Sequence, residues 1–355
     1  MDVHQFATAL SYGDAISDEM LEIRAVLREA GYRSEIFVRQ SDPRSAGHVR
    51  DYREYERLSD PANVVIFHFS IGSPVSRLFA RIPDRKILVY HNITPHEHFV
   101  DAHRILAREC YKGRLEINAF VGKTDLAVGD SDFNRRELEA VGYKRTGVLP
   151  ILMDFAKFDG EPDPVTLRLF DDGKTTLLFV GRFIPNKKFE DVVKVFHFYK
   201  THFNPESRLI LAGDYRGLER YLAGLQEFIL KLGTADVHLT GHIDFRELLA
   251  FYHLADVYIS MSEHEGFGVP LLESFHLGIP VIGYDAGAVA ETMNGGGIVL
   301  REKDFLKTAA LIDLVQRDEG LRRRIVEGQK AALAKYSRAN VSRTLLDLVE
   351  AARRG

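Results

Sequence analysis

The chain has 355 residues, a formal net charge of −4 at pH 7 and 45% hydrophobic residues, which is enough for two or three domains with cores of their own. The negative net charge argues against a nucleic-acid-binding protein, whose binding domain is usually strongly basic. The single cysteine, Cys110, excludes an intrachain disulfide framework and a multi-cysteine zinc site.

The amino-terminal segment 1–5 lacks the cationic and apolar regions of a signal peptide, and no apolar run reaches the roughly 18 residues that span a bilayer. We therefore expect a soluble, cytoplasmic protein, and we leave open peripheral docking at the inner face of the membrane. One candidate for contact with anionic lipid is the basic set Arg77, Arg81, Arg85 and Lys86. We favour the simpler interpretation, in which these side chains form a solvated face.

The first candidate binding segment is Ser11-Tyr12-Gly13-Asp14-Ala15, which precedes a helical pattern over residues 18–30. Gly13 would let a ligand come close to the backbone at a helix amino terminus. Asp14 has the type of side chain that caps helices. The segment therefore indicates either a ligand contact or a simple helix start.

Short apolar runs alternate with helical patterns along the chain. The runs are of the kind found in parallel strands covered on both faces: 64–69, 86–90, 177–180, 209–212 and 281–284. The helical patterns include 18–30, 189–199, 217–232 and 245–253. This alternation predicts an α/β protein with doubly wound sheets, whose ligands lie beyond the carboxyl ends of the strands.

His91 follows the apolar run 86–90 and precedes a turn proline, Pro95. A histidine at a strand end lies at the edge of the sheet where ligands bind, so His91 is a candidate functional residue. The nearby histidines are His96, His98 and His103. Their spacing is not that of a helical zinc-binding pair, and no carboxylate cluster accompanies them, so we expect no metal site.

Residues 155–164, rich in proline, glycine and charge, interrupt the alternation and indicate a linker between domains. We divide the chain into an amino-terminal Rossmann-like domain, 1–158, and a carboxyl-terminal one, 165–335. The final segment, 336–355, has apolar residues at helical spacing and predicts an amphipathic helix.

The apolar run 177–180 ends in Gly181-Arg182-Phe183-Ile184-Pro185-Asn186-Lys187-Lys188. Arg182 can pair with two anionic oxygens, and Lys187 supplies a compact point charge. Two spaced cations at a strand end are suited to clamping a diphosphate. Cation pairs are also common in solvated turns, so this assignment depends on the motif that follows.

The most informative segment is Ser262-Glu263-His264-Glu265-Gly266-Phe267-Gly268-Val269-Pro270-Leu271-Leu272-Glu273. It joins an apolar run, 256–261, to a helical pattern over 271–277. Its glycines allow close approach of a ligand, and the helix start offers unpaired N–H groups to an anion. Glu265 and Glu273, the latter expected in the first helical turn, are good acceptors for sugar hydroxyls. Phosphate and polyol chemistry in one place predicts a nucleotide sugar as the ligand.

This segment resembles the E-x7-E motif of retaining glycosyltransferases with the GT-B fold, in particular their fourth sequence family, the glycosyl transferases group 1. The string from Gly181 resembles the family's G-R-x-x-x-x-K-G, with Lys188 in place of the last glycine. Residues 285–291 resemble D-x-G-G-x-x-E, with Ala288 in place of the second glycine. The resemblance implies an α/β protein of the GT-B fold: two Rossmann-like doubly wound domains facing a central cleft.

The family's residue roles carry over to matching positions. Glu265 would hold hydroxyls of the donor sugar, and Glu273 the ribose. His91 matches a histidine near the donor sugar and the reaction centre, so the catalytic candidates are His91 and Glu265. The implied donor-binding set is Arg182, Lys187, Gly266, Phe267, Gly268 and Glu273.

Weaker matches complete the candidate site. The family has a glycine pair where this chain has only Gly13, and we assign Gly13 and Asp14 to an acceptor or donor-sugar contact. His242 and Ile243 correspond to a loop that holds the nucleotide base through backbone groups. Glu291 either borders the nucleotide site or caps a helix. In GT-B enzymes the last helix, here 336–355, crosses back to the amino-terminal domain.

The resemblance implies a retaining hexosyltransferase in polysaccharide biosynthesis, with GDP-mannose or a UDP-hexose as donor and a glycan or lipid-linked acceptor. No cofactor and no metal are expected, because cations neutralise the diphosphate. The alternative is a non-catalytic nucleotide-sugar-binding or scaffold protein of the same fold. A phosphorylase is less well supported, because the cofactor lysine motif of such enzymes is not found.

Overall fold

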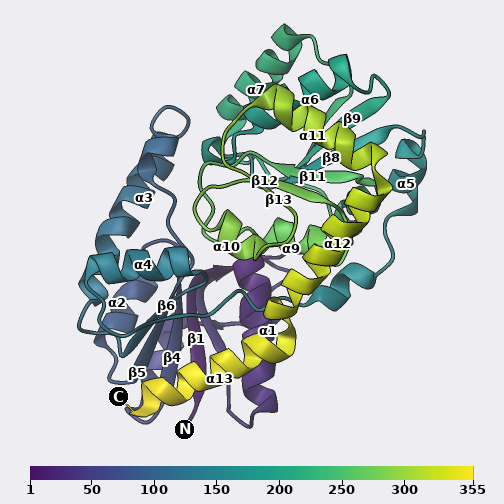
Figure 1. Ribbon diagram of the computed structural model, residues 1–355. Coiled ribbons are helices and arrows are strands. Elements are labelled where there is room, and N and C mark those ends of the chain that lie inside the picture. The colour runs from purple at the N-terminus through teal and green to yellow at the C-terminus, as the bar shows by residue number, and fades with distance from the viewer. Residues whose placement is uncertain (355) are drawn as a thin grey trace. The chain divides into compact units, whose positions relative to one another are not determined.

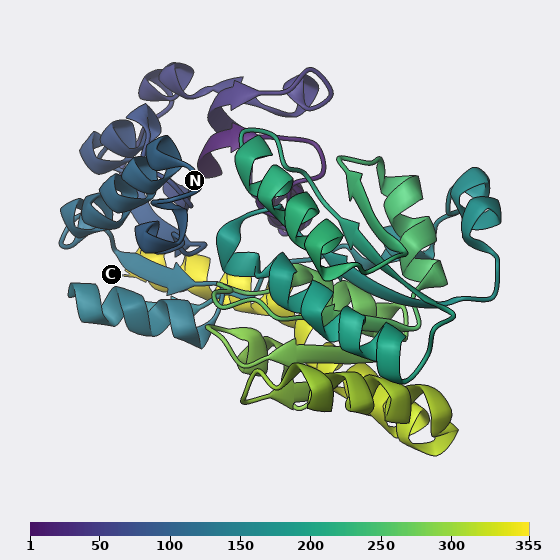
Figure 2. The same cartoon turned by 90° about the horizontal axis from the view of Figure 1, so that it is seen from above.

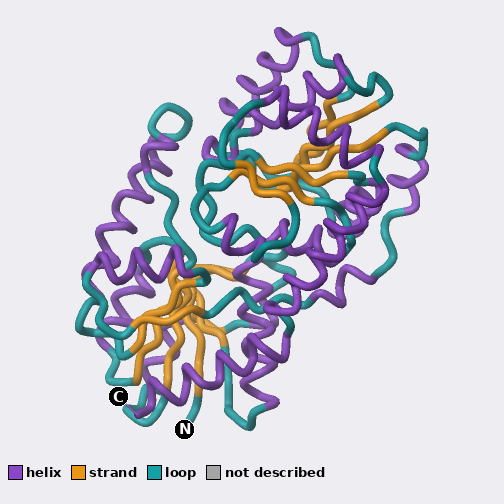
Figure 3. The backbone as a smooth tube through the Cα atoms, in the orientation of Figure 1, coloured by secondary structure: helices purple, strands orange, loops and turns teal. Residues whose placement is uncertain are grey.

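The computed structural model describes residues 1–354 and divides into two compact units. Unit 1 comprises Met1–His96, Ile105–Asp154 and the residues from Lys335 onward, and unit 2 comprises Glu97–Arg104 and Phe155–Ala334. Each unit has one parallel sheet, and the two sheets are the separate orange groups of strands in Figure 3. The predicted class, α/β with two doubly wound sheets, is therefore confirmed.

The sheet of unit 1 has seven parallel strands in the order β3-β2-β1-β4-β5-β6-β7. The strands are β1 (Val3–Leu10), β2 (Ile36–Ser41), β3 (Arg50–Asp51), β4 (Val64–Phe69), β5 (Arg85–Tyr90), β6 (Leu126–Gly129) and β7 (Thr146–Val148). The order reverses between β1 and β4. Loops at such a switch point diverge and leave room for a ligand.

The helices of unit 1 are α1 (Ala15–Glu29), α2 (Pro74–Arg81), α3 (Arg104–Glu116, from its second residue onward), α4 (Asp132–Val141) and α13 (Arg338–Arg354), with short 3₁₀ turns η1 (Ala46–His48), η2 (Tyr52–Arg57) and η4 (Ile117–Phe120). The turn η3 (His96–Phe99) begins in unit 1 and continues into unit 2. Figures 1 and 2 both show α13, in yellow, running beside the strands of unit 1. Its Val341, Leu345 and Val349 pack in one buried cluster with Ile23 and Leu27 of α1. The carboxyl-terminal helix therefore contributes to the core of unit 1.

The sheet of unit 2 has six parallel strands in the order β10-β9-β8-β11-β12-β13. They are β8 (Thr175–Val180), β9 (Ser207–Ala212), β10 (Val237–Gly241), β11 (Val257–Ser260), β12 (Val281–Tyr284) and β13 (Ile298–Leu300). Here the order reverses between β8 and β11. The two strongest motifs of the sequence follow these two strands.

The helices of unit 2 are α5 (Pro164–Phe170), α6 (Phe189–His202), α7 (Glu219–Leu232), α8 (Phe245–Leu254), α9 (Val269–His276), α10 (Val289–Met293), α11 (Phe305–Arg317) and α12 (Glu319–Leu333), with 3₁₀ turns η5 (Phe155–Asp159) and η6 (Pro185–Lys187). The turn η7 (Ala334–Tyr336) begins at the last residue of unit 2 and continues into unit 1. In Figure 1, α6, α7 and α11 lie on one side of this sheet, and α9, α10 and α12 on the other. No helix among residues 1–354 is long and apolar enough to cross a membrane.

The segment 155–164, expected as a linker, is more structured than its composition indicates. Its first half is η5, and Phe158 there is buried against the rings of Phe245 and Tyr252. A Pro- and Gly-rich composition reports turns, and it does not exclude an aromatic anchor between them. This segment therefore packs as part of unit 2.

Candidate functional site

The two motif loops of unit 2 meet at the switch point between β8 and β11. Lys187, in the loop after β8, donates to both carboxylate oxygens of Glu265, in the loop after β11, at 2.7 and 2.6 Å. The two side chains are 18% and 11% exposed. This ion pair is partly shielded from solvent, so it is stronger than a typical surface pair.

Further hydrogen bonds fix the two loops to each other. Asn186 Nδ2 donates to the carbonyl oxygen of His264 at 3.1 Å, and the Glu263 amide donates to the carbonyl oxygen of Asn186 at 2.8 Å. Asn186 is buried. The cationic loop and the acidic loop therefore form one polar surface at the carboxyl edge of the sheet.

Lys188, which replaces the glycine of the family string, adopts a left-handed conformation with φ of 51° and ψ of 50°. A side chain in this region costs about 1–2 kcal/mol, which explains why glycine suits the position. Its ammonium group lies 3.0 Å from Glu263. The loop thus keeps the glycine-type backbone, and the substitution adds a second lysine–glutamate pair beside the first.

Arg182 is exposed, and its guanidinium forms no hydrogen bond or ion pair with the residues that the structure describes. The backbone beside it is held by Gly213, where a Cβ atom would lie 1.9 Å from the carbonyl oxygen of Gly181. Gly213 also has a φ of 155°. The ends of β8 and β9 therefore approach too closely for any side chain, and Arg182 projects from a fixed turn.

The start of α9 has the features of an anion site. Gly268 is its N-cap, with a φ of 98° and no side chain to bond the first amides, and a proline occupies the first turn. The preceding residues, Gly266 and Phe267, form the turn, and Phe267 is buried while its carbonyl oxygen accepts a hydrogen bond from Thr292 Oγ1 at 2.7 Å. Pro270 has no amide hydrogen and the Leu271 amide donates to the Gly268 carbonyl oxygen at 3.0 Å, so the helix start attracts an anion mainly through the positive end of the helix dipole.

Glu273 lies in the second turn of α9, so its expected place in the first turn is wrong: the helix begins at Val269, two residues before the pattern indicated. The buried Tyr252 hydroxyl donates to Glu273 Oε2 at 2.5 Å. Burial and this carboxylate raise the pKa of Tyr252 well above its ordinary value. Tyr252 therefore fixes the orientation of the Glu273 carboxylate.

The loop after β12 supports the backbone of Glu265. The Ala288 amide donates to the Glu265 carbonyl oxygen at 2.9 Å. At Gly287, with a φ of 61°, a Cβ atom would lie 2.3 Å from that same oxygen. The glycine of the D-x-G string is thus required for the loop to reach Glu265. Glu291 lies in the first turn of α10, whose N-cap is Ala288.

Two predicted residues lie farther along the same edge. His242 and Ile243 follow β10, the edge strand, and His242 is exposed while Ile243 is half-buried. The carboxyl end of β10 belongs to the same edge of the parallel sheet as the motif loops, two strands from β8. No side-chain hydrogen bond links these two residues to the Lys187–Glu265 pair within the described part of the chain.

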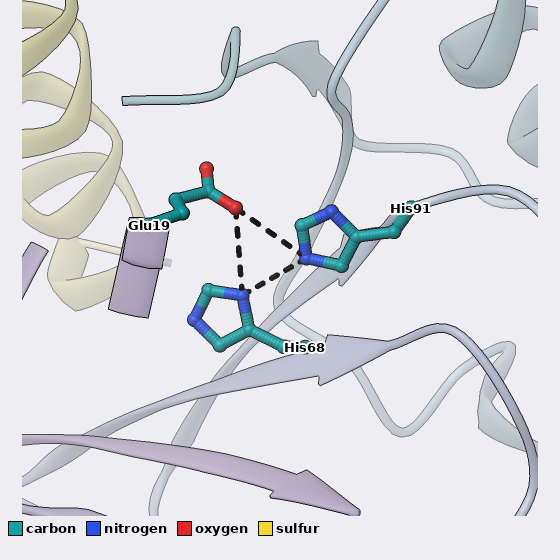
Figure 4. A group of neighbouring side chains, drawn as sticks. All are labelled: Glu19, His68 and His91. Carbon is teal, nitrogen blue, oxygen red and sulfur yellow. Dashed lines mark hydrogen bonds and ion pairs between the residues drawn. The ribbon is translucent and has the colours of Figure 1, made fainter. Parts of the chain in front are cut away.

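His91 of unit 1 belongs to a buried polar cluster that the sequence did not predict. Figure 4 shows it beside Glu19 of α1 and His68 of β4. His91 Nε2 lies 2.9 Å from His68 Nδ1 and 3.7 Å from Glu19 Oε2, and His91 Nδ1 lies 3.5 Å from Asp130 Oδ2. All four side chains are at most 2% exposed. Two carboxylates therefore flank one imidazole in a nearly dry environment.

The hydrogen bonds of Gln5 determine where the protons of this cluster lie. Gln5 Nε2 donates to the Met20 carbonyl oxygen at 2.9 Å, so Gln5 Oε1 must accept from His68 Nε2, 3.0 Å away. His68 Nδ1 then carries no proton and accepts one from His91 Nε2. This assignment of protons leaves His91 Nδ1 facing Asp130, where a second proton makes His91 a cation.

The charges follow the same pattern. Burial raises the pKa of Glu19 to about 7, against a smaller opposing effect of His91. Burial alone would lower the pKa of His91, but the interactions with Asp130 and with the charge of Glu19 outweigh it and raise that pKa. Burial and the neighbouring His91 lower the pKa of His68 well below its ordinary value. The cluster thus places a protonated His91 beside Asp130, with a neighbouring Glu19 whose pKa is about 7.

The same three side chains are the ones that could hold a metal ion. Glu19, His68 and His91 each offer one ligand atom, and these atoms lie within 4.8 Å of one another. No side chain among the described residues donates a hydrogen bond to Glu19, whose carboxylate interacts with the backbone at Leu152. However, one proton between the two imidazoles satisfies both ring nitrogens without a metal. We therefore assign the cluster to proton sharing.

Gly13 and Asp14 lie at the carboxyl end of β1, beside the switch point of unit 1. Asp14 is the N-cap of α1, and its carboxylate accepts from the Ser17 amide at 3.0 Å and the Ser17 hydroxyl at 2.9 Å. Gly13 has a φ of 77° and is exposed, with no atom within 4 Å of a Cβ position. Asp14 therefore starts α1, the helix that carries Glu19.

The family model of glycosyl transferases group 1 matches residues 168–332. Over 356 aligned residues the chain is 23% identical to the serotype-specific mannosyltransferase WbdA of Escherichia coli, covering 95% of this chain and 42% of that protein. The alignments with the first two curated relatives cover 42% and 46% of those proteins. The matched region is thus less than half of each of these two relatives.

Two solved structures share the fold over nearly the whole chain. Sucrose-phosphate synthase from Thermosynechococcus elongatus has a TM-score of 0.78 at 16% identity, covering 99% of this chain and 98% of that one. The Anabaena protein HepE in complex with UDP-glucose has a TM-score of 0.76 at 16% identity, covering 99% and 100%. At these identities the likeness shows a common fold.

Proposed function

We propose that the chain is a retaining glycosyltransferase of group 1, because the family model matches residues 168–332 and solved glycosyltransferases share its fold over nearly the whole chain. It would move a hexose from a nucleoside-diphosphate sugar to a glycan or lipid-linked acceptor. The observation that carries the proposal is the meeting of Lys187 and Glu265 at the β8–β11 switch point, beside the uncapped start of α9. This is where an open parallel sheet binds its ligand.

The chemistry of this edge supports a donor with both anionic and polyol groups. Arg182 and Lys187 supply positive charge and N–H donors for a diphosphate, and the positive dipole end of α9 lies at the same edge of the sheet. Glu265 and Glu273 supply acceptors for hydroxyl groups. A simple phosphate ester needs only the first set, and a free sugar only the second. A nucleotide sugar uses both.

We propose that the cations stabilise the negative charge that develops on the leaving diphosphate. The leaving phosphate then takes the proton of the acceptor hydroxyl as that hydroxyl attacks the same face of the sugar. A bound divalent metal is unnecessary for this step, because Arg182 and Lys187 already neutralise the diphosphate. His91, with its two flanking carboxylates, is proposed as a catalytic residue that orders the loop after β5.

Two donors fit the proposal. The name of the mannosyltransferase WbdA supports GDP-mannose, and the UDP-glucose complex of HepE supports a UDP-hexose. Base recognition through backbone groups at His242 and Ile243 would leave little side-chain signature, which is why both donors are retained. The acceptor is proposed from the family resemblance as a glycan or a lipid-linked intermediate.

A thermal-shift panel of nucleoside diphosphates and their sugars tests the proposal. A ligand at 100 times its dissociation constant stabilises the folded protein by about 2.7 kcal/mol. We expect stabilisation by one nucleoside diphosphate and its hexose, followed by release of that diphosphate on incubation. Stabilisation without release would indicate the non-catalytic binding protein, and no stabilisation by any member would contradict nucleotide-sugar binding.

A further inference from the structure

Helix α3 of unit 1 has its small residues inside and its large apolar residues outside. Its buried positions are Ala107, Cys110 and Gly113. Ile105, Tyr111 and Leu115 are 71%, 49% and 54% exposed. Among the described residues no other helix has as many exposed large apolar side chains. A helix that only covered its own sheet would have the opposite pattern.

The exposed positions form one continuous stripe. At 3.6 residues per turn, Ile105, Tyr111 and Leu115 fall within about 120° of the helix circumference. The same arc contains the exposed cations Arg108 and Lys112. We call these five residues the α3 face. Among residues 1–354, the one ion pair of the α3 face is a 3.4 Å contact between Lys112 and Glu109, at the margin of the arc.

The inner side of α3 packs on loops at the carboxyl edge of the unit 1 sheet. A Cβ atom on Gly113 would lie 2.8 Å from Ile93 Cδ1 and 3.5 Å from the Gly72 amide nitrogen, and Arg114 Nη1 donates to the Ile93 carbonyl oxygen at 2.5 Å. Ile93 follows His91, and Gly72 follows β4. The α3 face is therefore the outer surface of the element that covers the His91 loop.

We propose that the α3 face docks on an anionic phospholipid surface, with its apolar side chains at the acyl boundary and Arg108 and Lys112 against lipid phosphates. Arg108 and Lys112 lie within the apolar stripe, and their long side chains can extend to lipid phosphates while Ile105, Tyr111 and Leu115 contact the acyl boundary. This rests on the proposed function, because a lipid-linked acceptor is presented at such a surface. Docking through α3 brings the edge of the sheet that carries His91 toward it.

The basic set named from the sequence is a poorer candidate. Arg81 is paired with Glu56, Arg85 lies 3.0 Å from Asp125, and the buried Lys86 donates to the Ile82 carbonyl oxygen at 2.6 Å. Three of those four cations are therefore occupied within unit 1. The solvated face expected from the sequence holds for Arg77 and Arg81, which are exposed, and is wrong for Lys86, which is buried. Lipid contact is therefore assigned to α3.

Co-sedimentation with phosphatidylcholine vesicles, with and without phosphatidylglycerol, tests the proposal on the full chain. The wild type should bind the anionic vesicles, and added salt should weaken binding. Arg108→Glu/Lys112→Glu and Ile105→Ser/Leu115→Ser should each weaken it about tenfold or more. A matched control is Leu169→Ser/Leu230→Ser, because these leucines are 72% and 80% exposed on α5 and α7. It should bind as the wild type does.

Nucleoside diphosphate affinity, measured on every variant, separates this proposal from the proposed function, since neither α3 variant touches the Lys187 loop. Absence of wild-type binding to anionic vesicles would overturn the docking surface and leave the donor site standing. Equal loss in the Leu169/Leu230 control would also overturn it. A lipid-free dimer, seen by light scattering and abolished by Ile105→Ser/Leu115→Ser, would assign the α3 face to a second copy of the chain instead.

Discussion

Lys187 and Glu265 form a two-contact ion pair, with the ammonium nitrogen 2.7 and 2.6 Å from the two carboxylate oxygens. The pair links the residue proposed for the diphosphate to the residue proposed for the donor sugar. A diphosphate that binds Lys187 therefore competes with Glu265 for the same ammonium group. Sugar hydroxyls that bind Glu265 compensate for that loss, which couples the two halves of the donor.

Lys187→Ala should weaken nucleoside diphosphate binding by on the order of 1.5–3 kcal/mol, the range for a hydrogen bond to a charged group. It also leaves Glu265 without its cation beside the phosphate, which adds repulsion. Isothermal titration calorimetry measures the effect. Lys231→Ala is a matched control, because Lys231 is also paired with a glutamate, Glu227, at 2.6 Å on exposed α7. Unchanged affinity in Lys187→Ala would show that the clamp is misassigned.

Glu265→Ala and Glu273→Ala should have different effects. Glu265→Ala releases Lys187, so the affinity for the bare nucleoside diphosphate should be kept or increased while turnover of the sugar donor falls. Glu273→Ala should weaken binding of both ligands, because both contain the ribose. Calorimetry with the bare nucleotide and with its sugar compares them. Equal losses for the bare nucleotide would defeat this division of roles.

Gly287→Ala should reduce donor turnover through the backbone of Glu265. The added Cβ would lie 2.3 Å from the Glu265 carbonyl oxygen, so the loop must move. Gly295→Ala is the control: Gly295 also has a positive φ, 81°, but nothing lies within 4 Å of its Cβ position. Both variants bear a conformational cost of about 1 kcal/mol. If Gly295→Ala lowers turnover as much as Gly287→Ala does, the loss comes from the backbone cost alone, and the proposed contact between Gly287 and the Glu265 carbonyl oxygen does not explain it.

Glu19→Gln should stabilise the protein increasingly as the pH rises. Because the folded-state pKa of Glu19 is raised to about 7, the folded protein holds this proton more tightly than the unfolded chain does. Stability is therefore lost as Glu19 ionises, by on the order of 3 kcal/mol once the pH exceeds that pKa. Gln has no proton to lose.

Thermal denaturation of Glu19→Gln and wild type at about pH 5 and about pH 8 measures this effect. The midpoint temperature of the variant minus that of the wild type should be larger at the higher pH than at the lower pH. The reverse trend would mean that ionised Glu19 stabilises the fold through the His91 cation.

The class of the fold and the edge of the sheet that binds ligand were predictable, because they depend on local patterns. The runs 177–180 and 281–284 are continuous and apolar, as strands buried on both faces are. The strand β1 was not predicted, since His4 and Gln5 interrupt its apolar pattern. Both side chains are buried and form hydrogen bonds with residues distant in sequence. A pattern of a few neighbouring residues cannot identify such partners.

The polar cluster around His91 was not predictable for a related reason. Glu19, His68 and Asp130 come from three further elements and meet only when the sheet forms. The available signals were a histidine within the apolar strand β4 and a glutamate on the buried side of α1. Neither signal alone identifies a cluster, because a buried polar side chain forms hydrogen bonds with partners that depend on the fold.

Proton NMR of the wild-type protein with GDP-mannose or a UDP-hexose, in excess EDTA, tests the central claim most directly. The account predicts release of the nucleoside diphosphate and a sugar product whose first-formed anomeric signal keeps the α-configuration of the donor. Lys187→Ala should lose most of this turnover. A β-configured first product, or turnover that requires added magnesium, would contradict the retaining, metal-independent mechanism, and binding without any turnover would contradict the enzyme itself.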